Sequence, residues 1–227
     1  MAWAERKEIE SMYEYVAKSE YAPVKKELER IIKCVQIEMR EKHDLTFHFQ
    51  LIGSGRRHLV TRICDGNSGY DFDYNLIIPH PGNGYFYEAD ILKRDFITAF
   101  RNALQGTSYS FPKDLTSAIT IKVVDKNHKR IRHSCDFAII YYDTFEENDG
   151  YFYLRNNKKQ NKYEFAFRSL NCDTEEKVDD ICAENNGWND IREEYIKLKN
   201  INERTDKHSF SLYIEAVNNV YNQMFYQ

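Results

Sequence analysis

The stretch Tyr70-Asp71-Phe72-Asp73-Tyr74-Asn75-Leu76-Ile77-Ile78 alternates polar and apolar side chains, and this period of two is typical of a β-strand. Asp71 and Asp73 then project from the same face of that strand. Because aspartate is depleted in strands and like charges repel, such a pair needs a nearby cation or a raised pKa. The alternative is an edge strand with solvated carboxylates, but the apolar end of the stretch favours a central strand.

A third carboxylate, Asp136, precedes the apolar run Phe137-Ala138-Ile139-Ile140, which is typical of a strand buried on both faces. A buried carboxylate is costly unless it is paired or bound to a metal. If this strand neighbours the first, three acids converge and suit two metal ions that assist displacement at phosphorus. Two alternatives stay open: Asp125 is a rival third ligand, and Asp136 could instead form a salt bridge with Arg132 or Lys122.

The nature of these ligands narrows the choice of metal. Carboxylate oxygens without thiol or imidazole groups at ligand spacing favour Mg²⁺ or Mn²⁺. The five cysteines form no C-x-x-C pair, and the seven histidines show no zinc-ligand spacing. The sequence therefore predicts a magnesium or manganese site and no zinc site.

A glycine-rich turn, Gly53-Ser54-Gly55, ends an alternating run over residues 47–51. Glycines admit positive φ, and the free backbone N–H groups of such a turn can cradle a phosphate. Arg56 and Arg57 follow in the first turn of a helix predicted over residues 56–62, where positive charge opposes the helix dipole unless an anion binds. We therefore expect Gly53, Ser54, Arg56 and Arg57 to bind nucleotide phosphates. The alternative is an ordinary turn with solvated arginines.

A second basic cluster lies just before the third acid. Its members are Lys126, Lys129, Arg130, Arg132 and His133. Such a cluster could contact a triphosphate or a polynucleotide acceptor. A solvated turn is the alternative, and the sequence favours it.

Hydrophobic periodicity divides the remaining sequence into helices and strands. The predicted helices cover residues 5–18, 23–42, 56–62 and 89–104, with Pro23 in a first turn, and a helical C-terminal segment starts at Asp173, restarts at Asn189 and ends with a helix from Ser209. The predicted strands cover residues 47–51, 70–78, 119–124, 131–142, 151–155 and 163–168, the last four as two hairpins. We expect an α+β fold with a mixed, largely antiparallel sheet: a core over residues 1–170 and a helical segment over 171–227 packed on it.

Composition sets outer limits on function. The 227 residues include 32 basic and 36 acidic side chains, a net charge of −4 that gives no general affinity for nucleic acid or acidic lipid. A hydrophobic fraction of 42% excludes a wholly disordered chain. No apolar run approaches the ~20 residues of a membrane span, and the first residues lack the pattern of a signal peptide. We expect a cytoplasmic protein without a membrane partner.

Gly53-Ser54, the Asp71-Phe72-Asp73 strand and the later Asp136 together resemble the signature of the nucleotidyltransferase superfamily of the DNA polymerase beta type. The resemblance covers about residues 47–142. The helices ahead of the first strand resemble the branch of oligoadenylate synthetases and cyclic-dinucleotide synthases. The 16 residues between Ser54 and Asp71 are more than is usual in the superfamily, and the helical C-terminal part is shorter than in the cyclic-dinucleotide enzymes.

This resemblance implies that Gly53 and Ser54 hold nucleotide phosphates, that Asp71 and Asp73 bind the divalent metal, and that Asp136 completes the metal site and helps to deprotonate the acceptor. The first hypothesis is a metal-dependent enzyme that transfers a nucleoside monophosphate, from ATP or another nucleoside triphosphate, to an acceptor hydroxyl. The second is a non-catalytic module of the same fold that binds a nucleotide or a partner protein, as a sensor or an antitoxin would. The acceptor, the base preference and the oligomeric state stay open.

Overall fold

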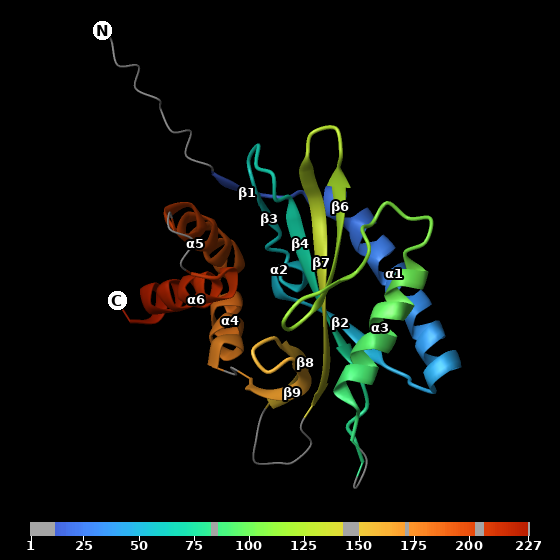
Figure 1. Ribbon diagram of the computed structural model, residues 1–227. Coiled ribbons are helices and arrows are strands. Elements are labelled where there is room, and N and C mark those ends of the chain that lie inside the picture. The colour runs from blue at the N-terminus through green and yellow to red at the C-terminus, as the bar shows by residue number, and fades with distance from the viewer. Residues whose placement is uncertain (1–11, 83–85, 143–149, 171–172, 203–206, 227) are drawn as a thin grey trace.

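The computed structural model describes residues 12–82, 86–142, 150–170, 173–202 and 207–226. The elements are β1 (Tyr13–Tyr15), α1 (Lys18–His43), β2 (His48–Ile52), α2 (Gly53–Arg56), β3 (Thr61–Ile63), β4 (Tyr70–Ile77), α3 (Ala89–Ala103), β5 (Lys113–Asp114), β6 (Ile119–Asp125), β7 (Arg130–Tyr142), β8 (Gly150–Asn157), β9 (Lys162–Ser169), α4 (Asp173–Ala183), α5 (Gly187–Ile201) and α6 (Ser209–Phe225). The described elements form an α+β arrangement, with a run of consecutive strands after α3 and three helices at the C-terminal end (Figure 1).

The central sheet has seven strands, in the order β2-β4-β7-β6-β5, with β8 paired to the far end of β7 and β9 paired to β8. All of these pairs are antiparallel except β4 with β7, which run parallel. A separate ribbon joins β1 to β3. The expected mixed, largely antiparallel sheet and its two hairpins, β6–β7 and β8–β9, are confirmed.

Two layers of helices flank the sheet. Helices α1 and α3 lie together on one side, and α4, α5 and α6 lie on the other (Figure 1). The face toward α1 and α3 carries the main core, in which Leu28 and Val35 of α1 and Phe96 of α3 are fully buried against Phe72 and Phe137 of the sheet. Apolar side chains at helical spacing give α1 and α3 the stripe that this packing requires.

The C-terminal helices have a smaller core of their own. Tyr195 of α5 and Val217 of α6 are buried there, and Leu59, which follows α2, inserts into the same cluster. Helix α5 begins at Gly187, two residues before the expected start at Asn189. Leu59 therefore ties the segment beside the glycine turn to the last third of the chain.

Three sequence expectations near the N-terminus are wrong. The helix expected over residues 5–18 is replaced over Tyr13–Tyr15 by strand β1, whose backbone pairs with β3, and residues 5–11 lie outside the described part. Helix α1 starts at Lys18, because the Ala17 carbonyl accepts the first helical N–H groups, so Pro23 lies beyond the first turn. The helix expected over residues 56–62 is also wrong, since the glycine turn itself forms α2 and Thr61 already belongs to β3.

Among the helices that the structure describes, none combines the length and apolar character that crossing a bilayer requires. The longest, α1, carries charged side chains along its exposed side.

Gly69 permits the approach of β4 to β7. Its φ is +63°, and a Cβ atom there would collide with the backbone carbonyl of Arg132. Gly106 also has a positive φ, +75°, but nothing lies within 4 Å of a Cβ built on it. We expect Gly106→Ala to cost about 1 kcal/mol from backbone strain alone, and Gly69→Ala to cost at least about twice that because the collision adds to the strain.

Urea-induced unfolding followed by circular dichroism measures both changes. Equal destabilisation by the two variants would show that the contact between Gly69 and β7 is not as close as described.

Candidate active site

The parallel pairing of β4 with β7 brings the acidic residues together. Asp73 lies directly opposite Asp136 in the register, and Asp71 lies opposite Ser134. Because in-register residues of paired strands project from the same face, all three carboxylates lie on the sheet face away from α1 and α3. The structure thus brings together the three acids that the sequence singled out.

Burial and mutual repulsion perturb these carboxyl groups. Burial, with the neighbouring charges of Asp71 and Asp136, raises the pKa of Asp73 from its ordinary 3.8 to about 7. Burial also raises the pKa of Asp136, while a hydrogen bond donated by the Thr120 hydroxyl lowers it in part. In the described part of the chain, no lysine, arginine or histidine forms an ion pair with any of the three acids. No direct ion pair therefore neutralises the cluster, and the nearby Lys199 interacts with Asp71 only at longer range.

The two rival interpretations of these acids do not hold. Asp125 is the last residue of β6, beside the turn of the β6–β7 hairpin, and bonds from His128 and Arg132 hold its pKa well below the usual range. Arg132 is therefore engaged with Asp125 rather than with Asp136. The side chain of Asp136 instead accepts a hydrogen bond from Thr120, its partner on β6.

The glycine turn lies against the second aspartate. Gly53 has φ +61°, and a Cβ atom there would lie 2.7 Å from Oδ2 of Asp73. A side chain at position 53 would thus be strained and would also push the carboxylate away. Glycine at this position lets the backbone of α2 approach Asp73 closely.

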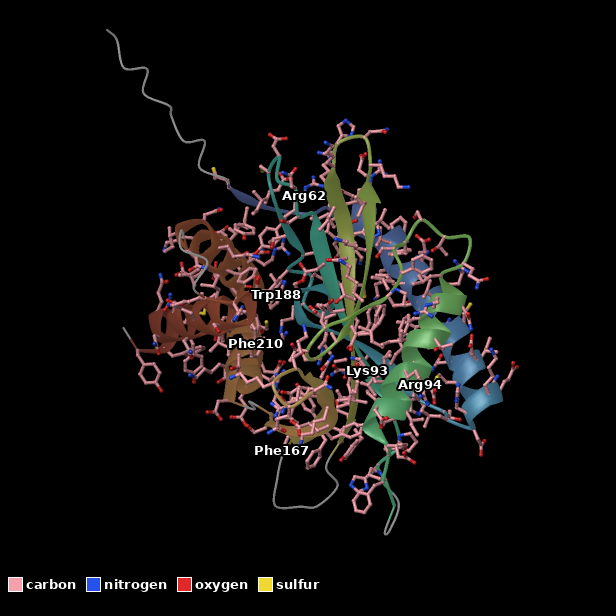
Figure 2. All side chains as sticks on the ribbon, in the orientation of Figure 1. Arg62, Lys93, Arg94, Phe167, Trp188 and Phe210 are labelled. Carbon is pink, nitrogen blue, oxygen red and sulfur yellow. The ribbon has the colours of Figure 1, made fainter. Side chains whose placement is uncertain are left out.

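The glycine turn, the acids of β4 and the C-terminal helices line one pocket. Its lining residues are Gly53, Ser54, Arg57, Leu59, Thr61, Asp71, Asp73, Tyr195, Lys199, Ser209, Phe210 and Tyr213. Phe210 lies between the C-terminal helices and the sheet (Figure 2). The pocket therefore combines an anionic wall on β4 with an aromatic and basic wall on α5 and α6.

Lys199 is the cation of this pocket that sequence reasoning missed. Its Nζ donates to Oγ1 of Thr61 over 2.8 Å and to Oγ of Ser209 over 3.3 Å, and it is 9% exposed. Burial lowers its pKa, and the Asp71 carboxylate opposes that shift. A signal was present in the sequence, since Lys199 follows Ile191 and Tyr195 at intervals of four on the buried face of α5.

The two arginines after the glycine turn have different surroundings. Arg57 lines the pocket, with Nη2 3.0 Å from Oε1 of Glu175 and its guanidinium 4.4 Å from the ring centre of Tyr213. Arg56 is exposed and does not line the pocket. Neither arginine lies in the first turn of a helix, as the sequence predicted, because Arg56 ends α2 and Arg57 follows it.

The residues of the basic cluster before the third acid also differ in their surroundings. His133 is buried, stacks on Tyr70 and contacts the Tyr109 hydroxyl, and burial lowers its pKa to about 4. Arg132 is exposed and its Nη2 lies 3.2 Å from Oδ2 of Asp125, so one of its donors is already used. Lys126, Lys129 and Arg130 are exposed.

The acids suit a hard divalent cation. Three carboxylates share one face and none of them forms a direct ion pair in the described part of the chain, and oxygen ligands of this kind prefer Mg²⁺ or Mn²⁺. Among the described residues, no three acidic, histidine or cysteine side chains are already gathered as a metal centre. One reason is visible in the structure: Oδ1 of Asp136 is turned toward Thr120. Binding a cation across all three acids would draw Asp136 toward Asp73.

Comparisons with known proteins identify the fold. No protein-family model matches the chain, and no curated protein matches it in sequence. Solved structures match it: Vibrio cholerae DncV in its GTP-bound form has a TM-score of 0.55 and 15% identity over 91% of this chain and 52% of that one. Escherichia coli DncV bound to 3′-deoxy GTP has a TM-score of 0.54 and 15% identity, over 91% of this chain and 54% of that one.

A third solved structure, the Bradyrhizobium diazoefficiens CD-NTase CdnG in complex with GTP, has a TM-score of 0.50 and 13% identity, over 76% of this chain and 44% of that one. The chain spans about half the length of these proteins. At such low identity the match shows the fold alone. The chain thus shares its fold with these DncV and CD-NTase structures, and this agrees with the α+β fold expected from the sequence.

The pKa of Asp73 predicts how stability depends on pH when divalent metal is chelated. Between its ordinary pKa of 3.8 and its folded pKa of about 7, the folded chain holds a proton that the unfolded chain releases. Asp73 therefore makes the folded state less stable as the pH rises through that range. We expect Asp73→Asn, which stays neutral, to unfold at a higher temperature than the wild type at pH 8 in EDTA, with a smaller difference at pH 5.

Thermal unfolding followed by circular dichroism checks this. Asn75→Asp, two residues further along the same face of β4, is the opposite change and should be less stable than the wild type at pH 8. A wild type more stable than Asp73→Asn at pH 8 in EDTA would contradict the repulsion described.

Proposed function

We propose that this protein is a metal-dependent nucleotidyltransferase, which transfers a nucleoside monophosphate from a nucleoside triphosphate to an acceptor hydroxyl. The observation that carries the proposal is the in-register pair Asp73 and Asp136 beside a glycine turn and a buried lysine. Paired carboxylates without a direct ion pair suit a divalent metal, and the adjoining backbone and lysine suit phosphate. The groups suited to the metal and the groups suited to the phosphates thus lie next to each other, as a phosphoryl-transfer site requires.

The triphosphate binds in the pocket between β4 and the C-terminal helices. The backbone N–H groups of Gly53 and Ser54 and the ammonium of Lys199 hold the β- and γ-phosphates. Arg57 is the second cation of this pocket, and Tyr213 offers an aromatic face on which the base can stack. The solved neighbours DncV and CdnG, with bound GTP, support the choice of a nucleoside triphosphate.

The chain's acids carry the transfer. Asp71, Asp73 and Asp136 are the residues that would hold the divalent cation, and Asp136 accepts the proton of the acceptor hydroxyl. The acceptor oxygen forms a bond to the α-phosphorus while the bond from that phosphorus to the bridging oxygen of the β-phosphate breaks, and pyrophosphate leaves. When bound, Mg²⁺ or Mn²⁺ neutralises the charge that develops on the phosphoryl oxygens.

Incubation with α-³²P-labelled nucleoside triphosphates, Mg²⁺ and a panel of acceptors tests the reaction. We expect labelled product and one pyrophosphate per transfer with the wild type, and at least about a hundredfold less with Asp73→Asn, because one preorganised electrostatic group contributes on that scale. Asp65→Asn, in the loop before β4, is the matched control and should retain activity.

Full activity of Asp73→Asn would overturn the proposal. Magnesium-independent nucleotide binding without pyrophosphate release would instead favour the non-catalytic module.

The role of Lys199 is tested separately by nucleotide binding. Lys199→Gln keeps a polar group for Thr61 and Ser209 but removes the charge, so ATP affinity should fall about 10- to 100-fold, the value of a charge-assisted hydrogen bond. Lys197→Gln, in which the lysine is exposed and paired with Glu194, is the control and should bind as the wild type does. Isothermal titration calorimetry with ATP makes the comparison, and equal affinities of the two variants would exclude a phosphate role for Lys199.

A further inference from the structure

A groove beside β6 lies outside the pocket described above. It is lined in part by Phe111, Lys122, Val124 and Lys126, together with the chain that follows α3. Phe111 is 75% exposed and Val124 39%, so the groove presents two large apolar side chains to solvent. No residue lines both this groove and the pocket beneath α5 and α6.

The lining residue of the groove nearest to the third acid along β6 is Lys122, two residues from Thr120. Thr120 of β6 lies opposite Asp136 and donates a hydrogen bond to it. Strand alternation puts Lys122 on the same face as Thr120, while Ile121 and Val123 are buried on the other face. From Thr120 to Lys126 the chain advances roughly 20 Å. The exposed side of β6 thus leads from Asp136 to the tip of the β6–β7 hairpin.

Uncompensated positive charge follows this path. Lys122 and Lys126 have no acidic partner in the described part of the chain, and neither do Lys129 and Arg130 at the hairpin tip. Asp125, the acid within this hairpin, is occupied by Arg132 and His128. In a chain with a net charge of −4, such a basic line is a local feature and suits a polyanion.

We propose that this groove binds a single-stranded polynucleotide and that its 3′-terminal hydroxyl, reaching Asp136, is the acceptor of the transfer. Lys122 and Lys126 contact two phosphates of the strand, and Phe111 stacks on a base, which is the combination by which proteins hold single strands without reading their sequence. The acceptor role rests on the proposed function, but binding of the strand does not. The triphosphate approaches from the side of β4 and the acceptor from the side of β6, so the two substrates meet at the Asp73–Asp136 pair.

Fluorescence anisotropy tests binding, with the full chain and a 5′-fluorescein 12-nucleotide single-stranded RNA of mixed sequence, without nucleoside triphosphate. We expect binding that weakens about sevenfold between 50 and 200 mM salt if two phosphates are contacted. Lys122→Glu with Lys126→Glu should lower the affinity at least about tenfold and flatten the salt dependence. Phe111→Ala should lower it about fivefold or more, from lost stacking.

The matched control is Lys26→Glu with Lys33→Glu, which makes the same charge change at two exposed positions of α1, on the opposite side of the sheet. This control should bind RNA nearly as the wild type does. Equal losses in the two double variants, no binding at 50 mM salt, or equal displacement of the RNA by poly-glutamate would each overturn the proposed groove.

A transfer assay with the same RNA as acceptor separates this inference from the proposed function. If the wild type binds RNA but transfers no label to any acceptor, both the acceptor role of the RNA and the proposed enzymatic function are refuted. The proposal that the groove binds RNA would stand. If the wild type transfers label to a mononucleotide but not to RNA, the acceptor role of the RNA is refuted. The proposed nucleotidyltransferase activity would stand.

Discussion

The parallel pairing of β4 with β7 is the constraint on which the site depends. It puts Asp73 and Asp136 side by side, and their mutual repulsion opposes the pairing. Packing on the other face of the sheet stabilises the pairing against this repulsion. Phe72, which precedes Asp73, and Phe137, which follows Asp136, are fully buried under α1 and α3. Alternation along these strands therefore couples a strong apolar core on one face to a strained acidic cluster on the other.

The C-terminal helices form the second wall of the pocket whose first wall is on the sheet. The acids and the glycine turn supply one wall of the pocket, while Lys199, Phe210 and Tyr213 supply the other. Lys199 reaches Thr61, and Leu59 enters the core of α5 and α6, so the second wall is fixed to the segment after the glycine turn. A ligand bound in this pocket touches elements far apart in the chain, and its binding should stabilise their packing.

The sequence predicted the parts of the fold that local pattern determines. Alternation predicted β4, the two hairpins and the face shared by Asp71 and Asp73, and together with the helical periodicity it predicted the α+β fold class. Which strands pair is a tertiary property, so the meeting with Asp136 was only a conditional expectation. Lys199 was missed because the sequence does not show what the apolar face of α5 packs against. Without that knowledge, a single lysine on this face does not indicate a binding site. The conversion of residues 13–15 into β1 depends on β3, a partner 48 residues away in the register.

The central claim is that the paired carboxylates of β4 and β7 hold a divalent cation. Electron paramagnetic resonance of Mn²⁺ titrated into the purified chain measures this directly, because bound and free ion differ in signal. The account predicts saturable binding by the wild type that is lost or weakened at least about tenfold in Asp73→Asn and in Asp136→Asn, with Asp125→Asn unchanged. Wild-type affinity in both Asp73→Asn and Asp136→Asn would contradict it.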